Sequence, residues 1–120
     1  LELNNFFIKL MKKNRNGMII SILSELTKSE PSLGMGIYTA EKSYINKITE
    51  HWGKELGDYG IKIVNISPRM LNTEFNSQID KRYLDEIKKK GGFSKIEDII
   101  NLLNKIIKSP SKYCGKNILA

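Results

Sequence analysis

The spacing of apolar residues predicts that the chain starts with a helix followed by a strand. Residues 1–14 carry apolar side chains at helical spacing, and Asn16 and Gly17 favour an end to this helix. Residues 18–23 form a short apolar run, MIISIL, that is rich in β-branched side chains. Such a run is typical of a strand that is covered on both faces, as in a parallel sheet.

A second helix and strand follow at the same kind of spacing. From about residue 38 to residue 56 the apolar positions are helical again, and residues 61–67, IKIVNIS, predict a second strand. Pro68 cannot continue that strand in the middle of a sheet. The loop before the helix, TKSEPSLGMG, contains proline and glycine, which favour turns.

The last third of the chain predicts one or two more helices and a final strand. Residues 74–92 are polar with scattered apolar anchors, which indicates a loop and a loosely amphipathic helix. Ser94 to Glu97 has the pattern of a capping box, so we expect the next helix to open there and to end at Ser109 and Pro110. KNILA supplies a last strand, and the alternation of helices and strands predicts an α/β fold around a parallel sheet.

Composition narrows the class of protein. Residues 1–120 fit a single domain, and 40% hydrophobic with 28% charged residues is typical of a soluble globular protein without a membrane partner. The formal net charge of +7 raises the question of nucleic acid, but the lysines are interleaved with acids. We interpret Lys88, Lys89 and Lys90, just before two glycines, as a helix C-terminus, and we expect no nucleic-acid partner.

The scarcity of cysteine and histidine excludes several kinds of site. The single cysteine, Cys114, cannot form an internal disulfide and favours a reducing, cytoplasmic location. With His51 as the single histidine, neither a metal-ligand cluster nor a Ser/His/Asp set is expected.

Candidate chemistry gathers where the predicted strands end. The C-terminal ends of parallel strands share one edge of a sheet, and ligands bind in the crevice outside them. Ser24 follows the first strand, residues 68–73 follow the second, and Tyr38 begins the helix that starts at the same edge. Lys42 shares a helical face with Tyr38, because the two are four positions apart.

The pairing of Tyr38 with Lys42 predicts acid–base chemistry. A free tyrosine titrates at about pH 10, so its pKa must fall by about three units to work near neutrality. A nearby ammonium and a helix N-terminus both favour the phenolate. The spacing alone is weak evidence, and the alternative is a surface tyrosine beside a solvated lysine.

Taken together, these segments resemble the short-chain dehydrogenase/reductase family. NGMIISILS resembles the family's strand that ends at the catalytic serine, and YTAEK matches its Y-x-x-x-K motif. IKIVNISPRMLNT resembles the next strand with the segment that lines the nicotinamide, and FSKIEDIINLLNKIIKSPSKYCGKNILA resembles the last helix and strand. The resemblance implies part of a doubly wound, Rossmann-like sheet, and a cofactor that is NADP or NAD, with NADP favoured.

The resemblance also assigns roles by position. It implies that Ser24 hydrogen-bonds a carbonyl or alcohol substrate, that Tyr38 passes the proton, and that Lys42 binds the nicotinamide ribose and lowers the tyrosine pKa. The residues expected to contact the cofactor are Tyr38, Lys42, Pro68, Arg69, Leu71 and Thr73. Residues 74–92 would form a lid over the substrate.

Three features depart from the family's pattern. Glu25 follows Ser24 where the family often has a small or apolar residue, and Ser21 and Ser29 compete with Ser24 for its role. Arg69 stands where the family usually has glycine. The family's glycine-rich pyrophosphate turn has only a weak imitation in residues 34–36, so we expect the 120 residues to begin inside a larger fold and to hold its C-terminal catalytic portion.

A second function class follows from the same helices. The chain could be a non-catalytic piece that acts as an association or dimerisation unit. In the family, helices that resemble residues 1–14 and 38–56 build a dimer interface, so the resemblance also implies a homo-oligomer. The apolar side chains expected on this face are Phe6, Phe7, Leu10, Tyr44, Ile48 and Trp52, and burial in the chain's own core is the alternative.

Overall fold

A computed structural model describes residues 2–120 and confirms the α/β prediction. In chain order the elements are α1 (Glu2–Asn14), β1 (Gly17–Ile22), η1 (Glu25–Thr27), α2 (Gly36–Glu55), η2 (Gly57–Tyr59), β2 (Ile61–Ser67), η3 (Glu74–Gln78), α3 (Lys81–Lys89), α4 (Ile96–Lys108), α5 (Pro110–Tyr113) and β3 (Asn117–Leu119). The prefix η marks short 3₁₀ helices. The ends of α3 at Lys89 and of α4 at Lys108 agree with the predicted helix ends.

The sheet is parallel, with strand order β1-β2-β3. Gly17 pairs with Ile61 at one end of the β1–β2 ladder and Ile22 pairs with Ile66 at the other. The central strand β2 is buried at every position except the half-buried Lys62. This burial explains why its sequence is a nearly continuous apolar run rather than an alternating one.

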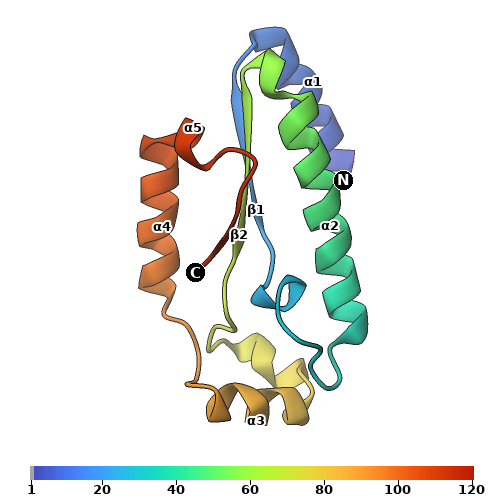
Figure 1. Cartoon of the computed structure of the whole chain (residues 1–120), viewed down its shortest axis with the longest axis vertical. Helices are drawn as coiled ribbons and strands as arrows, with labels where there is room; N and C mark the ends of the chain where they lie inside the picture. Colours follow the sequence, from blue (N-terminus) through green and yellow to red (C-terminus); the bar gives the residue numbers. More distant parts are fainter. Residues whose placement is uncertain (1) are drawn as a thin grey trace.

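Helices cover both faces of the sheet. In Figure 1, α1 and α2 run along one side of the strands and α4 runs along the other. Ile8 of α1 packs with Ile61 and Ile63 on the first side, while Ile106 of α4 packs with Val64 on the second. Successive residues of β2 therefore point into two separate cores.

A buried polar network ties α2 to the sheet. The Asn65 amide nitrogen donates to the Thr49 hydroxyl at 2.7 Å and to the Asn46 side-chain oxygen at 3.1 Å. The Asn117 amide donates to the same Asn46 oxygen at 2.8 Å, and the Ser67 hydroxyl donates to the Asn117 side chain at 2.6 Å. One helix and two strands are thus joined by directional contacts, which hold α2 at a defined place on the sheet.

The capping-box prediction at Ser94 is wrong. The residue before α4 is Lys95, and no side chain caps that helix end. The Ser94 backbone instead donates to the Met70 carbonyl at 2.9 Å, and Ser94 forms an isolated parallel bridge with Leu71. This pairing keeps the Ser94 backbone extended, so the helix begins at Ile96.

The apolar face expected on the first two long helices is only partly buried. Trp52 packs against the cluster around Ile8 and Ile63. Other apolar side chains of these helices remain exposed, among them Leu3, Phe6, Phe7, Leu10 and Tyr44. None of the helices within residues 2–120 combines the length and apolarity that crossing a bilayer requires.

Candidate active site

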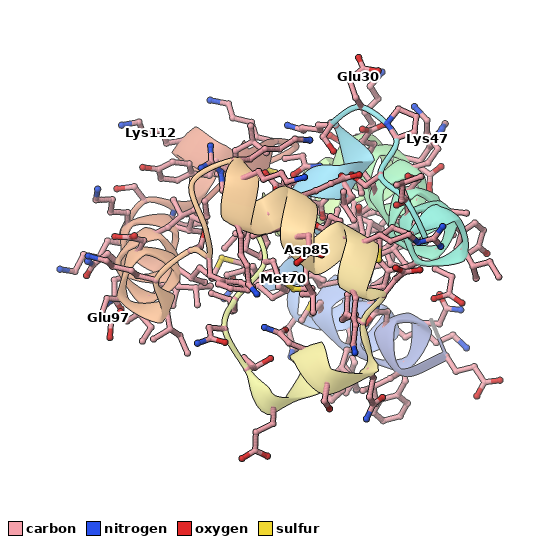
Figure 2. The ribbon with its side chains drawn as sticks, turned by 90° about the horizontal axis from the view of Figure 1, so that it is seen from below. Glu30, Lys47, Met70, Asp85, Glu97 and Lys112 are labelled. Atoms are coloured by element: carbon pink, nitrogen blue, oxygen red, sulfur yellow. The ribbon has the colours of Figure 1, made fainter. Side chains whose placement is uncertain are left out.

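The predicted site residues come together at the C-terminal edge of the sheet. A cavity of about 210 Å³ opens there, and its lining includes Ser24, Tyr38, Lys42, Pro68, Arg69, Leu71 and Thr73. Figure 2 looks onto this edge, across which α3 lies. Met70, labelled in that view, also lines the cavity and packs against the apolar cluster that contains Tyr83 of α3.

Ser24 is held rigidly at the end of β1. Leu23 donates its backbone N–H to the Ile66 carbonyl at 2.7 Å, which continues the ladder by one residue. The Ser24 side chain then caps η1 by accepting from the Leu26 N–H at 3.3 Å, and the residue is only 7% exposed. Of the serines that compete for this role, Ser21 lies within β1, and Ser29 lines a different cavity.

Tyr38 lies in the first turns of α2, where its ring packs against the cluster of Leu26, Met35 and Tyr83. Burial raises the pKa of its phenol above the ordinary value, and a hydrogen bond with the Ser24 side chain acts in the opposite, lowering direction. The net direction differs from the lowering expected from the sequence.

Lys42 lies one turn along α2 from Tyr38. Its ammonium is 5.7 Å from the centre of the Tyr38 ring and donates to the Ile22 carbonyl at 3.3 Å. The predicted proximity is therefore present, but the cation is held at the end of β1 rather than against the phenol oxygen. Burial consequently decides the direction of the Tyr38 pKa shift.

Residues 68–73 form a segment that is fixed at several points. The Arg69 N–H donates to the Ala120 carbonyl at 3.0 Å, and the Asn76 amide donates to the Leu71 carbonyl at 3.1 Å. Pro68 is buried, whereas Arg69 and Thr73 are exposed. The segment therefore offers both an anchored backbone and accessible side chains at the rim of the cavity.

Two of the departures from the family's pattern contact each other. The Arg69 guanidinium lies 3.5 Å from the Glu25 carboxylate, and the Glu25 N–H donates to the Pro68 carbonyl at 3.0 Å. An ion pair and a backbone hydrogen bond thus join the residue after Ser24 to the segment after β2. The sequence flags both residues as unusual, but it carries no signal that they form a pair.

Tyr83 of α3 is a cavity residue that the sequence placed only in a general lid. Its ring is 4% exposed and lines the cavity opposite the sheet edge. Burial raises its pKa to about 12, and the charges of Glu25, Tyr38 and Glu86 add to this shift. The phenol of Tyr83 is therefore a neutral hydrogen-bonding group at neutral pH.

Gly34 has a structural role in a tight turn near this site. It has a positive φ of 72°, which glycine adopts without strain, and a Cβ there would overlap the Asp80 side chain. Asp80 in turn caps α3 by accepting from the Arg82 N–H at 2.9 Å. The glycine is thus explained by a tight turn packed against the start of α3.

Comparisons with known proteins agree with the fold and the motifs. The sequence profile described as short chain dehydrogenase matches residues 1–84. Sorbitol-6-phosphate 2-dehydrogenase from Klebsiella pneumoniae is 43% identical over 61 residues, which cover 51% of this chain and 22% of that protein. The aligned segment thus covers less than a quarter of this relative's length.

Solved structures share the same arrangement of elements. A short chain dehydrogenase from Leptospira borgpetersenii with bound NAD+ superposes with a TM-score of 0.80 at 21% identity, covering 98% of this chain and 48% of that one. A gluconate 5-dehydrogenase from Burkholderia cenocepacia, in complex with NADP and tartrate, gives 0.77 at 19% identity, with coverage of 93% and 46%. The profile match over residues 1–84 and the shared fold lead to one conclusion: the chain belongs to the short-chain dehydrogenase family of oxidoreductases.

Proposed function

We propose that the protein containing this chain is an NAD(P)-dependent oxidoreductase that reduces a carbonyl or oxidises an alcohol, with Tyr38 as proton donor and acceptor. One observation carries the proposal: Ser24, Tyr38 and Lys42 come from two separate segments and line the same cavity. Family membership supports the reaction class, and the geometry supports these residues as its acid–base group.

The environment of Tyr38 suits proton donation. Because burial raises its pKa, the phenol holds its proton at neutral pH and can deliver it to a developing alkoxide on the substrate. The Ser24 hydroxyl lines the same cavity as Tyr38 and can orient the substrate oxygen between the two residues. In the direction of alcohol oxidation, the hydrogen bond from Ser24 and the ammonium of Lys42 favour the phenolate that accepts the proton.

The residues present fit the nicotinamide end of the cofactor. The Lys42 ammonium has three N–H donors and uses one on the Ile22 carbonyl, which leaves donors for ribose hydroxyls. Leu71 and Thr73 stand at the same cavity for the amide end, with Pro68 and Arg69 next to them. The bound nicotinamide supplies the hydride chemistry, and the chain supplies the proton and the positioning.

The relatives suggest where to begin with substrates. The Klebsiella pneumoniae relative is named for sorbitol 6-phosphate, so a secondary alcohol on a polyol chain is the first class of substrate to assay.

The single free cysteine, Cys114, fits a reducing cytoplasmic location for such metabolism.

The test is Tyr38→Phe in the natural full-length protein, with Tyr44→Phe as a matched control on the same helix. Tyr44 is 58% exposed and is not among the residues that line the cavity, so the loss of its hydroxyl leaves the cavity unchanged. The turnover rate, followed by cofactor absorbance, should fall by about 10²- to 10⁴-fold in Tyr38→Phe and stay unchanged in Tyr44→Phe. Full turnover by the Tyr38 variant would reject the assignment.

Homo-association is a second proposal, because α1 and α2 leave adjacent apolar side chains exposed. Phe6 is 59% exposed, and its ring packs edge-on against the ring of Phe7. The two rings together present a large apolar surface to solvent. Sedimentation of the full-length protein should show that Phe6→Ser weakens an oligomer, whereas Ile107→Ser on the opposite side, at α4, leaves it intact. Unchanged sedimentation of both variants would reject an interface at α1.

A further inference from the structure

A second, smaller cavity lies against the candidate active site. Its volume is about 130 Å³, and Arg69 and Tyr83 line both cavities. These two side chains therefore form a partition between the cavity that contains Tyr38 and the second one. A space of this size is large enough for several water molecules or for a short polar chain.

The two side chains of the partition are held differently, because the Arg69 side chain is 62% exposed whereas Tyr83 is buried. Arg69 is paired with Glu25 at 3.5 Å, and its backbone N–H is bonded to the Ala120 carbonyl. Tyr83 is almost fully buried between Leu26 and Ile87 in the cluster under α3. A substrate reacting beside Tyr38 would therefore meet a buried phenol and an exposed guanidinium, and the guanidinium can move towards solvent and open a route into the second cavity.

The second cavity carries balanced charge and several hydroxyl partners. Its carboxylates are Glu25 and Glu86, its cations are Arg69 and Lys90, and its hydroxyls are Ser29 and Ser32. Acceptors and donors thus occur together, which suits an alcohol group that both donates and accepts. The two carboxylates and two cations cancel, and Arg69 is already paired with Glu25, so the cavity has no excess positive charge that would select a phosphate or carboxylate end.

We propose that the second cavity binds the distal, uncharged and hydroxylated end of the substrate, and that Tyr83 and Arg69 determine specificity for that end. This inference rests on the proposed function, because it requires the carbonyl or alcohol carbon to react beside Tyr38. The neutral state of the Tyr83 phenol, whose pKa is raised to about 12, supports its use as a hydrogen-bond donor.

The experiment compares substrates of different length in the natural full-length protein. Hydroxyacetone fills the first cavity alone, fructose extends a hydroxylated chain, and fructose 6-phosphate ends in a charge. Tyr83→Phe should lower kcat/KM for fructose about 10-fold or more relative to hydroxyacetone, since a polar contact is lost while the ring remains. Tyr59→Phe, at the other end of the sheet, is the matched control and should leave the ratio unchanged.

Glu86→Gln tests the charge argument at a position remote from Tyr38. Removing one of the two carboxylates should raise kcat/KM for fructose 6-phosphate relative to kcat/KM for fructose. A wild-type preference for the phosphate ester, or an equal loss on all ketones in Tyr83→Phe, would overturn the proposal and leave the proposed function standing.

A binding measurement separates the two proposals if no ketone is turned over. In protein with ¹³C-labelled isoleucine methyl groups, titration with sorbitol should shift the signal of Ile87, which lines the second cavity and not the first, and sorbitol 6-phosphate should shift it less. This result would support the second cavity even though the proposed reaction had failed. An unperturbed Ile87 signal would overturn the inference.

Discussion

Thr49→Val should destabilise the protein, because it removes one acceptor from the buried network that joins α2 to the sheet. Thr49 is 1% exposed and Asn65 is 3% exposed, so neither group can turn to solvent. Valine keeps the β-branched shape and the approximate volume of threonine, which leaves the hydroxyl as the main change.

The magnitude follows from the hydrogen bonds. The Asn65 amide loses its 2.7 Å bond to the Thr49 hydroxyl and keeps the longer 3.1 Å bond to Asn46. Leaving a buried donor short of a partner costs about 1–3 kcal/mol, and the remaining bond places the expected loss in the lower half, at about 1–2 kcal/mol. The threonine hydroxyl's own bond goes to the Ile45 carbonyl at 2.8 Å and adds little, because helix carbonyls are already bonded.

The assay is urea unfolding of the natural full-length protein, followed by circular dichroism. Thr39→Val is the matched control, since Thr39 lies on the same helix but is half-buried and outside the network. We expect the control to stay within about 0.5 kcal/mol of the wild type. If Thr49→Val also stays within that margin, the network does not hold α2 on the sheet, and the argument for a fixed Tyr38 and Lys42 loses its support.

Three further predictions concern the core, a turn and a helix cap. Ile106→Ala should cost about 2–5 kcal/mol in unfolding experiments because Ile106 is fully buried, while Ile107→Ala, at 56% exposed, should cost less than about 0.5 kcal/mol. Gly34→Ala should cost about 1–3 kcal/mol through its positive φ and the overlap with Asp80, while Gly36→Ala, which meets no neighbour, should be tolerated in the same measurement. The Arg82 guanidinium lowers the pKa of Asp80 to about 2. The stabilising effect of Asp80 on α3 is therefore complete above the unfolded-state pKa of about 3.9 and is lost as the pH falls through 2. The protection of α3 amides from hydrogen exchange should fall with this titration in the wild type and should not respond to it in Asp80→Asn. Identical pH profiles of exchange in the two proteins would contradict the cap.

The elements could be predicted from the sequence because their signals are local. The run at residues 61–67 is apolar throughout since both faces of β2 are buried, and the spacing in the helices reflects contact with one face of the sheet. Ser94 shows where local reasoning fails. Its motif satisfies the capping rule, but the backbone pairs with Leu71 from a distant part of the chain, and this contact decides the conformation.

The candidate site likewise contains residues whose position could be predicted from the sequence and residues whose position could not. Parallel strands have a common C-terminal edge, so the topology alone was enough to gather Ser24, Tyr38 and residues 68–73. The pairing of Glu25 with Arg69 and the inward position of Tyr83 depend on how side chains from separate elements meet. The direction of the Tyr38 pKa shift was missed for a related reason, because burial is a property of the assembled cluster and not of the Tyr38–Lys42 spacing.

In the reaction that we propose, the raised pKa of Tyr38 and the placement of Lys42 would be compatible parts of one acid–base arrangement. Burial stabilises the protonated phenol before reaction, so a proton is available at neutral pH. Once the proton had left, the half-buried surroundings of Tyr38 would screen the phenolate less than water does, which would strengthen its attraction to the Lys42 ammonium 5.7 Å from the ring centre. In the proposed reaction the lysine would therefore contribute most after charge has developed, and interactions that grow along a reaction accelerate it more than those that are present from the start.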